Sequence, residues 1–229
     1  TGAKEGVIAL KGHYAGAVKA LTAASEGVEN VRVHLLKEYY PAGDEQQIVY
    51  DVTGRVVPTG GLPLDVGAVV SNASTLLNVA RAAEGKKVVE KYVTVGGAVR
   101  TPVTVKVPVG ISCRELLEAA GGTTETCRYL IGGPCTGGVG DNPDQPVTKT
   151  TGGLLAIPVA HPYWKKRSER INLQLIQSVC CQCSMCTQMC PRNALGLNVQ
   201  PHKAMRTIAQ GLDLLGDANG VFSCCNCGL

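Results

Sequence analysis

Eight of the eleven cysteines lie between residues 180 and 227, and most of them fall at spacings typical of metal ligands. The first group follows the pattern C-x2-C-x2-C-x3-C-P, with Cys180, Cys183, Cys186 and Cys190 followed by Pro191. The two-residue gaps allow three thiolates of one compact loop to reach three corners of a cubic cluster, and the proline turns the chain away. This group therefore predicts ligands of a 4Fe-4S cluster.

The second group repeats the start of the first. Residues 222–229, FSCCNCGL, echo residues 178–186, so that Cys224 and Cys227 correspond to Cys180 and Cys183. In two-cluster proteins the fourth cysteine of such a run ligates the other cluster. Because the repeat stops after Cys227, and the chain begins with threonine, we expect a fragment whose second motif is truncated and whose two clusters both lack ligands.

A structural zinc site is the main alternative, since two Cys-x2-Cys pairs suffice for one tetrahedral zinc. Zinc needs neither the third cysteine of the run nor its Cys-Pro ending, so the pattern favours iron. A disulfide scaffold is disfavoured because such proteins are short and loop-rich. We assign no chemistry to the remaining cysteines, which are Cys113, Cys127, Cys135, Cys181 and Cys225.

A helix is predicted over residues 164–179, and it leads into the first cysteine motif. Residues 161–229 then form a helical, ferredoxin-like iron-sulfur region. The predicted helix carries a basic run, Lys165, Lys166, Arg167 and Arg170. This run either docks an acidic partner and favours a reduced cluster, or is a solvated helix face, and the second interpretation is preferred.

Residues 87–160 read as a small β-grasp module. Apolar and polar residues alternate on both sides of Gly96-Gly97, which predicts a β-hairpin. A helix over residues 112–120 opens with a capping box of Ser112 and Glu115, and a further strand covers residues 128–131. The glycine-rich stretch over residues 132–140 is interpreted as a tight turn.

Residues 1–86 predict an α/β layer. Strands over residues 7–10 and 31–35 flank a helical pattern from Tyr14 to Leu21, a unit whose strands should run parallel. Further helices are predicted over residues 43–52 and 73–83.

Composition limits the class of protein. The net charge of +4 is spread without a block of like charges, and only 4% of residues are aromatic, so nucleic acid is not an expected partner. The sequence has neither an apolar run long enough for a transmembrane segment nor a secretion signal. Crowded cysteines in such a chain favour a reducing, cytoplasmic location.

Five segments in this order carry a resemblance to a known family: residues 39–58, 61–82, 93–110, 132–138 and the cysteine run. Together they resemble the C subunit of the Rnf electron-transport complex and the cobalamin (corrin) reductases of propanediol-utilising microcompartments. Both are similar to the flavin-carrying NADH-binding subunit of respiratory complex I. The resemblance implies that residues 1–86 are the C-terminal part of a Rossmann-like FMN- and NADH-binding domain.

The resemblance also implies flavin contacts, at Tyr40, Gly43, Asp44, Glu45, Asn72 and Thr75. Asp44 and Glu45 would hold a ribityl hydroxyl or oppose a nicotinamide ribose. The alternative remains open that these two acids simply complement a helix N-terminus. The glycine-rich loop that cradles the FMN phosphate in the relatives has no counterpart before Gly43, so FMN is assigned to the longer parent protein.

The implied function is electron transfer. The parent enzyme would pass electrons from NADH through FMN and two 4Fe-4S clusters to a corrinoid-dependent enzyme or to other electron-transfer subunits of an Rnf-type chain. Its location would be cytoplasmic, within a bacterial microcompartment or peripheral to a membrane complex. No catalytic side chain is assigned. The alternative is a non-catalytic β-grasp ligand-binding or docking module with a structural zinc site.

Overall fold

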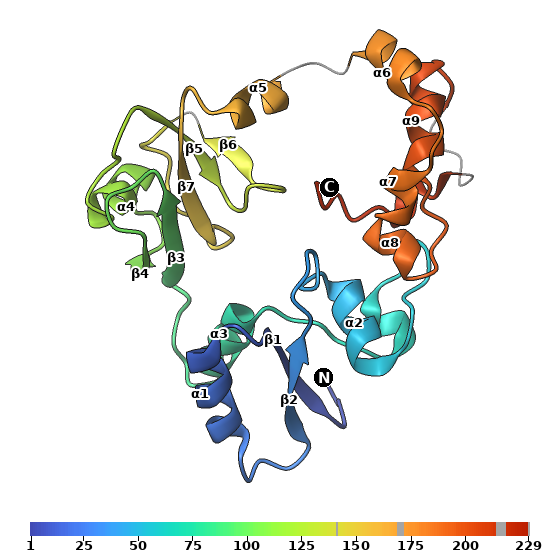
Figure 1. Cartoon of the computed structure of the whole chain (residues 1–229). Coiled ribbons are helices and arrows are strands. Elements are labelled where there is room, and N and C mark those ends of the chain that lie inside the picture. The colour runs from blue at the N-terminus through green and yellow to red at the C-terminus, as the bar shows by residue number, and fades with distance from the viewer. Residues whose placement is uncertain (141, 169–171, 214–218, 229) are drawn as a thin grey trace. The chain divides into compact units, whose positions relative to one another are not determined.

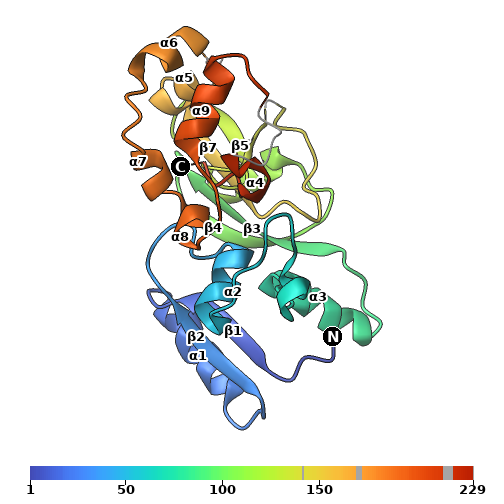
Figure 2. The ribbon, with the colours of Figure 1, turned by 90° about the vertical axis from the view of Figure 1, so that its right-hand side faces the viewer.

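The computed structural model describes residues 1–140, 142–168, 172–213 and 219–228. It divides the chain into two compact units. Residues 1–72 and 172–225 form the first unit, and residues 73–171 and 226–229 form the second. Figure 1 shows the elements in chain order, and Figure 2 shows them from the side.

The first unit begins with the predicted strand-helix-strand motif. β1 (Gly6–Lys11) and β2 (Val31–Leu36) pair in parallel, with α1 (Ala15–Ser25) between them in sequence. α2 (Glu45–Thr53) follows, and the 3-10 helix η1 (Pro63–Val66) comes after it. α2 ends at Gly54, whose φ of 71° is the left-handed conformation that glycine adopts at low cost.

The C-terminal part of the first unit consists of short helices. They are α6 (Leu173–Val179), α7 (Met185–Gln188), α8 (Pro191–Ala194), α9 (Pro201–Ala209) and the 3-10 helix η3 (Val221–Ser223). Gln177 of α6 donates a side-chain hydrogen bond to the carbonyl of Ala209, and Thr187 shares one with His202 at 2.6 Å. Side chains of α6 and α7 are thus tied to α9.

The prediction of one continuous helix over residues 164–179 is wrong. α5 (Pro162–Ser168) and α6 are separate, and Asn172 before α6 has an extended backbone. Its side-chain oxygen accepts a hydrogen bond from the Leu175 N–H at 2.9 Å. Asparagine competes for backbone donors in this way, which favours helix starts over helix interiors. Arg170 of the basic run lies outside the described residues.

The second unit opens with α3 (Ala73–Ala83) and contains a five-stranded sheet of order β4-β3-β7-β5-β6. The strands are β3 (Glu90–Gly97), β4 (Val103–Pro108), β5 (Cys127–Ile131), β6 (Gly138–Gly140) and β7 (Gly153–Pro158). β3 and β4 are antiparallel, which confirms the predicted hairpin, although its turn follows Gly97. The glycine-rich stretch predicted as a turn also contains β6.

The core of the second unit lies between this sheet and α4 (Cys113–Ala119). Val93 and Val95 of β3, Leu116 of α4, and Leu154 of β7 are all fully buried there. Alternate burial along β3 and β7 gives each strand one core-facing side. β7 pairs with both β3 and β5, so it is the strand that joins the two halves of the sheet.

α5 is fixed to the same unit by Trp164 and Arg167. Trp164 is buried, and its indole N–H donates to the carbonyl of Pro158 at 3.0 Å. Arg167 donates to the Tyr163 hydroxyl at 2.6 Å and to the carbonyl of Gly137. Arg167 therefore contributes to the packing of α5 and is not simply a solvated charge of the basic run.

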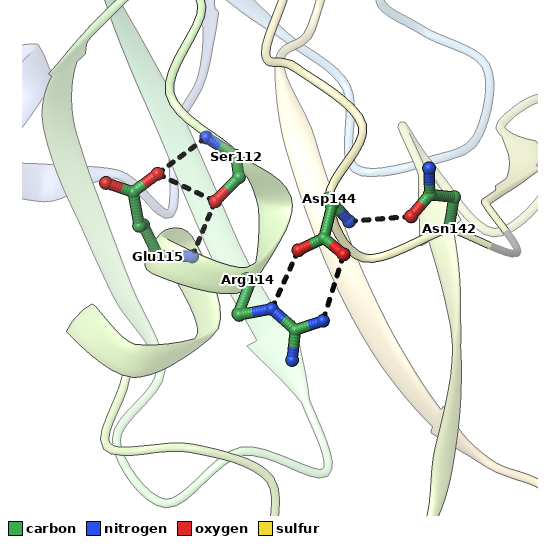
Figure 3. A network of polar contacts seen from close by, with 5 residues as sticks. All are labelled: Ser112, Arg114, Glu115, Asn142 and Asp144. Carbon is green, nitrogen blue, oxygen red and sulfur yellow. Dashed lines mark hydrogen bonds and ion pairs between the residues drawn. The ribbon is translucent and has the colours of Figure 1, made fainter.

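The capping box predicted for α4 is present (Figure 3). The Glu115 N–H donates to Ser112 Oγ at 3.2 Å, and the Ser112 N–H donates to the Glu115 carboxylate at 2.9 Å. Substitution Ser112→Ala removes one of these bonds, so we expect the free energy of unfolding to fall by about 1 kcal/mol in denaturant titrations. Arg114→Gln, which removes an exposed ion pair with Asp144, is the control and should have a much smaller effect.

Within the residues that the structure describes, no helix is both long enough and apolar enough to cross a membrane.

Candidate iron-sulfur and flavin sites

The first cysteine motif is built from helix ends. Cys180 is the C-terminal cap of α6, and Cys190 is the N-terminal cap of α8, whose first residue is Pro191. Between them, Gln182 and Ser184 have φ values of 59° and 60°. Left-handed backbone is uncommon for residues other than glycine, and two such residues curl the loop tightly. Two left-handed residues are the backbone feature that we expect in a loop that wraps around a cluster.

Hydrogen bonds favour the thiolate form of Cys183. The pKa of the Cys183 thiol is lowered, chiefly because the backbone N–H of Met185 donates to its sulfur, with a further contribution from the Cys181 thiol. Gln182 donates from Nε2 to the Cys180 sulfur at 3.2 Å. The thiolate is the form of cysteine that ligates metals, so the lowered pKa suits Cys183 to that role.

The donor set fits a 4Fe-4S cluster by its chemistry. Four cysteine thiols lie in one short segment that contains two left-handed residues and ends in a Cys-Pro pair. Among the described residues, no three Cys, His, Asp or Glu side chains come close enough together to hold a single metal ion. Cys183 and Cys186 are exposed, and Cys180 and Cys190 are half-buried. The assignment of these four ligands remains a prediction.

The second motif repeats the conformation of the first as well as its sequence. Asn226 has a φ of 51° and occupies the position in the repeat that Gln182 occupies in the first motif. η3 delivers the chain to Cys224, and Ser223 shares a hydrogen bond with Thr59 at 3.0 Å. The match of left-handed residues supports two related cluster loops, with Cys224 and Cys227 as the predicted ligands of the second.

Four of the six predicted flavin contacts lie in or just after the turn that precedes α2. Tyr40, Gly43 and Glu45 are exposed, and Asp44 is partly shielded by its partners. Asp44 is the N-cap of α2 and accepts a hydrogen bond from the Gln47 N–H at 3.3 Å, so the capping role considered from sequence is present. Asn72 immediately precedes α3, and Thr75 lies in the first turn of that helix. The flavin role of all six remains a prediction.

Sequence reasoning missed the partner of Asp44. Arg192 of α8 donates from Nη2 to Asp44 Oδ1 at 3.1 Å, and its Nη1 contacts the side-chain oxygen of Gln46. The side chain of Arg192 is only 7% exposed. The two partners lie 148 positions apart in sequence, and no local pattern in either segment predicts that they meet.

Two hollows were also not predicted. One of about 240 Å³ lies beside Cys180 and is lined by residues of α6 and α9, among them Gln177 and Arg206. The other, of about 450 Å³, lies in the second unit, where Thr148, Thr150 and Thr151 form much of its lining. Neither Asp44 nor Arg192 is among the residues that line these two hollows.

Cysteines outside the two motifs include two that behave as structural residues. Cys113 is buried in the core of the second unit, and burial raises the pKa of its thiol. Burial also raises the pKa of Cys127. A raised pKa disfavours the thiolate form of both residues in the metal-free protein.

Three family models match the chain in the predicted order. The Nuo51 FMN-binding domain matches residues 1–81, the SLBB domain matches residues 92–137, and the 4Fe-4S dicluster domain matches residues 179–229. These matches confirm the predicted fold class, with a flavin-domain part, a β-grasp module and an iron-sulfur region. They also support FMN and iron-sulfur clusters as the cofactors, and they favour iron over zinc.

Curated relatives match nearly the whole chain. Cobalamin reductase PduS of Salmonella typhimurium is 46% identical over 212 residues, which cover 91% of this chain and 47% of the relative. The C subunit of the Na(+)-translocating ferredoxin:NAD(+) oxidoreductase complex of Acetobacterium woodii is 31% identical over 201 residues, covering 86% and 43%. The chain thus spans about half the length of the curated relatives it matches.

Among solved structures, an NAD+-reducing [NiFe]-hydrogenase in the H2-reduced state matches 99% of this chain and 47% of its own, with a TM-score of 0.61. At 17% identity this likeness concerns the fold alone. The sequence matches go further, because they include both the domain order and the cysteine region. The chain is therefore a homologue of the PduS cobalamin reductases and of the C subunits of ferredoxin:NAD(+) oxidoreductase complexes.

Proposed function

We propose that this chain is the part of an NADH-dependent oxidoreductase that carries electrons from FMN through 4Fe-4S clusters to an acceptor. The observation that carries the proposal is the combination of an FMN-domain match over residues 1–81 with a dicluster match over residues 179–229. The left-handed residues shared by the two cysteine loops support it independently.

Each group has a defined task. Bound FMN would accept a hydride and release electrons singly, and the clusters would conduct them onward. On the protein side, the N–H groups around Cys183 would stabilise negative charge on sulfur, which tunes the reduction potential. The proposed cluster ligands are Cys180, Cys183, Cys186 and Cys190 for the first motif, and Cys224 and Cys227 for the second. The proposed flavin contacts are Tyr40, Gly43, Asp44, Glu45, Asn72 and Thr75.

The acceptor we propose is a corrinoid, because PduS, which is named a cobalamin reductase, is 46% identical to this chain over 91% of its length. An Rnf-type chain, suggested by the relatives from ferredoxin:NAD(+) oxidoreductase complexes, is the second candidate. The corresponding locations are a bacterial microcompartment and the surface of a membrane complex. The electron donor we propose is NADH, because residues 1–81 match the Nuo51 FMN-binding domain.

The test is metal analysis and electron paramagnetic resonance on the complete protein, purified without oxygen. We expect about eight irons per chain and cluster signals that appear when NADH is added. The oxidised protein should be brown and should bleach on reduction. Zinc at about one per chain without iron would instead make the cysteine region a structural module and refute electron transfer.

A further inference from the structure

Arg192 is a buried charge placed immediately after the first cysteine motif. It follows Cys190 by two residues, and its side chain is 7% exposed. Taking a guanidinium out of water is costly unless it is paired and hydrogen-bonded. Here Asp44 and Gln46 supply the partners, and both belong to the same unit as Arg192.

The pairing is incomplete in a way that stability alone does not explain. Within the described residues, Arg192 Nε is buried and has no hydrogen-bond partner. A buried ion pair is often no more stabilising than apolar residues of similar volume, and an unsatisfied donor adds to its cost. The presence of such a group at this position points to a role in placement rather than in stability.

Each of the two segments that Arg192 joins bears proposed cofactor contacts. Its helix, α8, has four residues and is capped by Cys190, so it is too short to hold its own orientation. Its partner Asp44 caps α2 beside Gly43 and Glu45. One guanidinium thus connects the helix that begins at a predicted cluster ligand to the predicted flavin segment.

We propose that Arg192 is a positioning residue that clamps the Cys190 end of the first cluster motif to the flavin-contact segment at the N-terminus of α2. This inference rests on the proposed function for its effect on electron transfer. The clamp itself is a property of the protein side chains and is testable without cofactors. The planar fork of arginine binds two partners at once, which lysine does not reproduce.

The substitutions are chosen to separate charge from geometry. Arg192→Gln removes the guanidinium, and Arg192→Lys keeps the charge without the fork. Asp44→Asn removes the ion pair and keeps the N-cap, because asparagine is as good an N-cap as aspartate; since Asp44 is also a proposed flavin contact, this variant is used only in the cofactor-free measurement. The pair Arg114 and Asp144 is the control, since it is also an arginine-aspartate contact but is exposed and lies in the second unit.

The first readout is hydrogen exchange of the Ile48 amide, which bonds to the Asp44 carbonyl in the first turn of α2. In the cofactor-free protein, Arg192→Gln and Asp44→Asn should each accelerate its exchange about tenfold or more, and the double variant should be no faster than Arg192→Gln. Arg114→Gln should leave this amide unchanged. Unaltered exchange in both single variants would refute the clamp.

The second readout is the rate at which NADH reduces the first cluster in the loaded protein, followed in stopped flow. We expect Arg192→Gln to slow it about 10- to 100-fold with iron content retained, and Arg192→Lys to give an intermediate rate. Direct reduction by a small chemical reductant should stay near the wild-type rate. Equal NADH rates in all variants would overturn the proposal, whereas absence of iron from the wild type would refute the proposed function and leave the exchange test valid.

Discussion

Replacing Cys183 with serine is expected to remove the first cluster while leaving the fold intact. Cys183 lies in the curled loop between α6 and α7, is exposed, and has a lowered thiol pKa. A serine hydroxyl remains protonated at neutral pH and is a poor iron ligand, so three thiolates cannot hold the cube reliably. The complete protein should lose about four of about eight irons, the corresponding resonance signal and NADH-driven reduction of the remaining cluster.

Cys181→Ser is the matched control, because Cys181 is an exposed thiol in the same loop to which we assign no ligand role. It should retain the iron content of the wild type, with at most a shift in the potential of the first cluster through its hydrogen bond with Cys183. Both variants should unfold at the same denaturant concentration as the wild type when cofactors are absent. A Cys183→Ser protein with full iron and unchanged reduction kinetics would show that Cys183 is not a ligand.

Local patterns in the sequence predict much of this molecule. The parallel β1-α1-β2 motif and the capping box at Ser112 are predictable because each depends on residues close together in the chain. The cysteine spacing is equally informative, since ligation of a compact cluster restricts which positions can carry thiols. The domain matches confirm the predicted order of flavin-domain part, β-grasp module and iron-sulfur region.

Features set by distant contacts were not predictable. β7 occupies the middle of the five-stranded sheet, yet residues 153–158 form a short apolar run that has no clear alternation. The ion pair of Arg192 with Asp44 joins segments 148 positions apart. The break before α6 depends on whether the Asn172 side chain caps a helix or faces solvent, a choice that helical periodicity cannot reveal.

The residues of the candidate site also differ in whether local sequence alone predicts them. The cluster cysteines are recognisable from sequence because each motif is short and continuous, whereas the flavin contacts were inferred from family resemblance alone. For Asp44, the structure adds a capping bond and an ion pair, and both are compatible with a flavin contact made by its neighbours. The position of Cys224 depends on another long-range contact, because the backbone of Gly220 packs closely against the backbone of Asn198.

Gly220→Ala is expected to disrupt the segment that delivers Cys224. Gly220 is buried with a φ of 65°, and an added Cβ would overlap the backbone carbonyl of Asn198, which cannot move aside as the end of a flexible side chain could. Left-handed strain and overpacking together should lower the free energy of unfolding by about 2–5 kcal/mol in denaturant titrations. Because the Ser223 N–H bonds to the Gly220 carbonyl in this turn, the iron content of the second cluster should fall as well.

Gly211→Ala separates the two causes. Gly211 has a similar φ of 69°, but a Cβ there would meet no atom within 4 Å, so this variant carries the conformational strain without the overlap. It should be destabilised by only about 1 kcal/mol and should bind iron normally. If Gly220→Ala were no less stable than Gly211→Ala, the close approach of residue 220 to Asn198 would be refuted. The position of η3 and Cys224 would then depend chiefly on the hydrogen bond between Ser223 and Thr59.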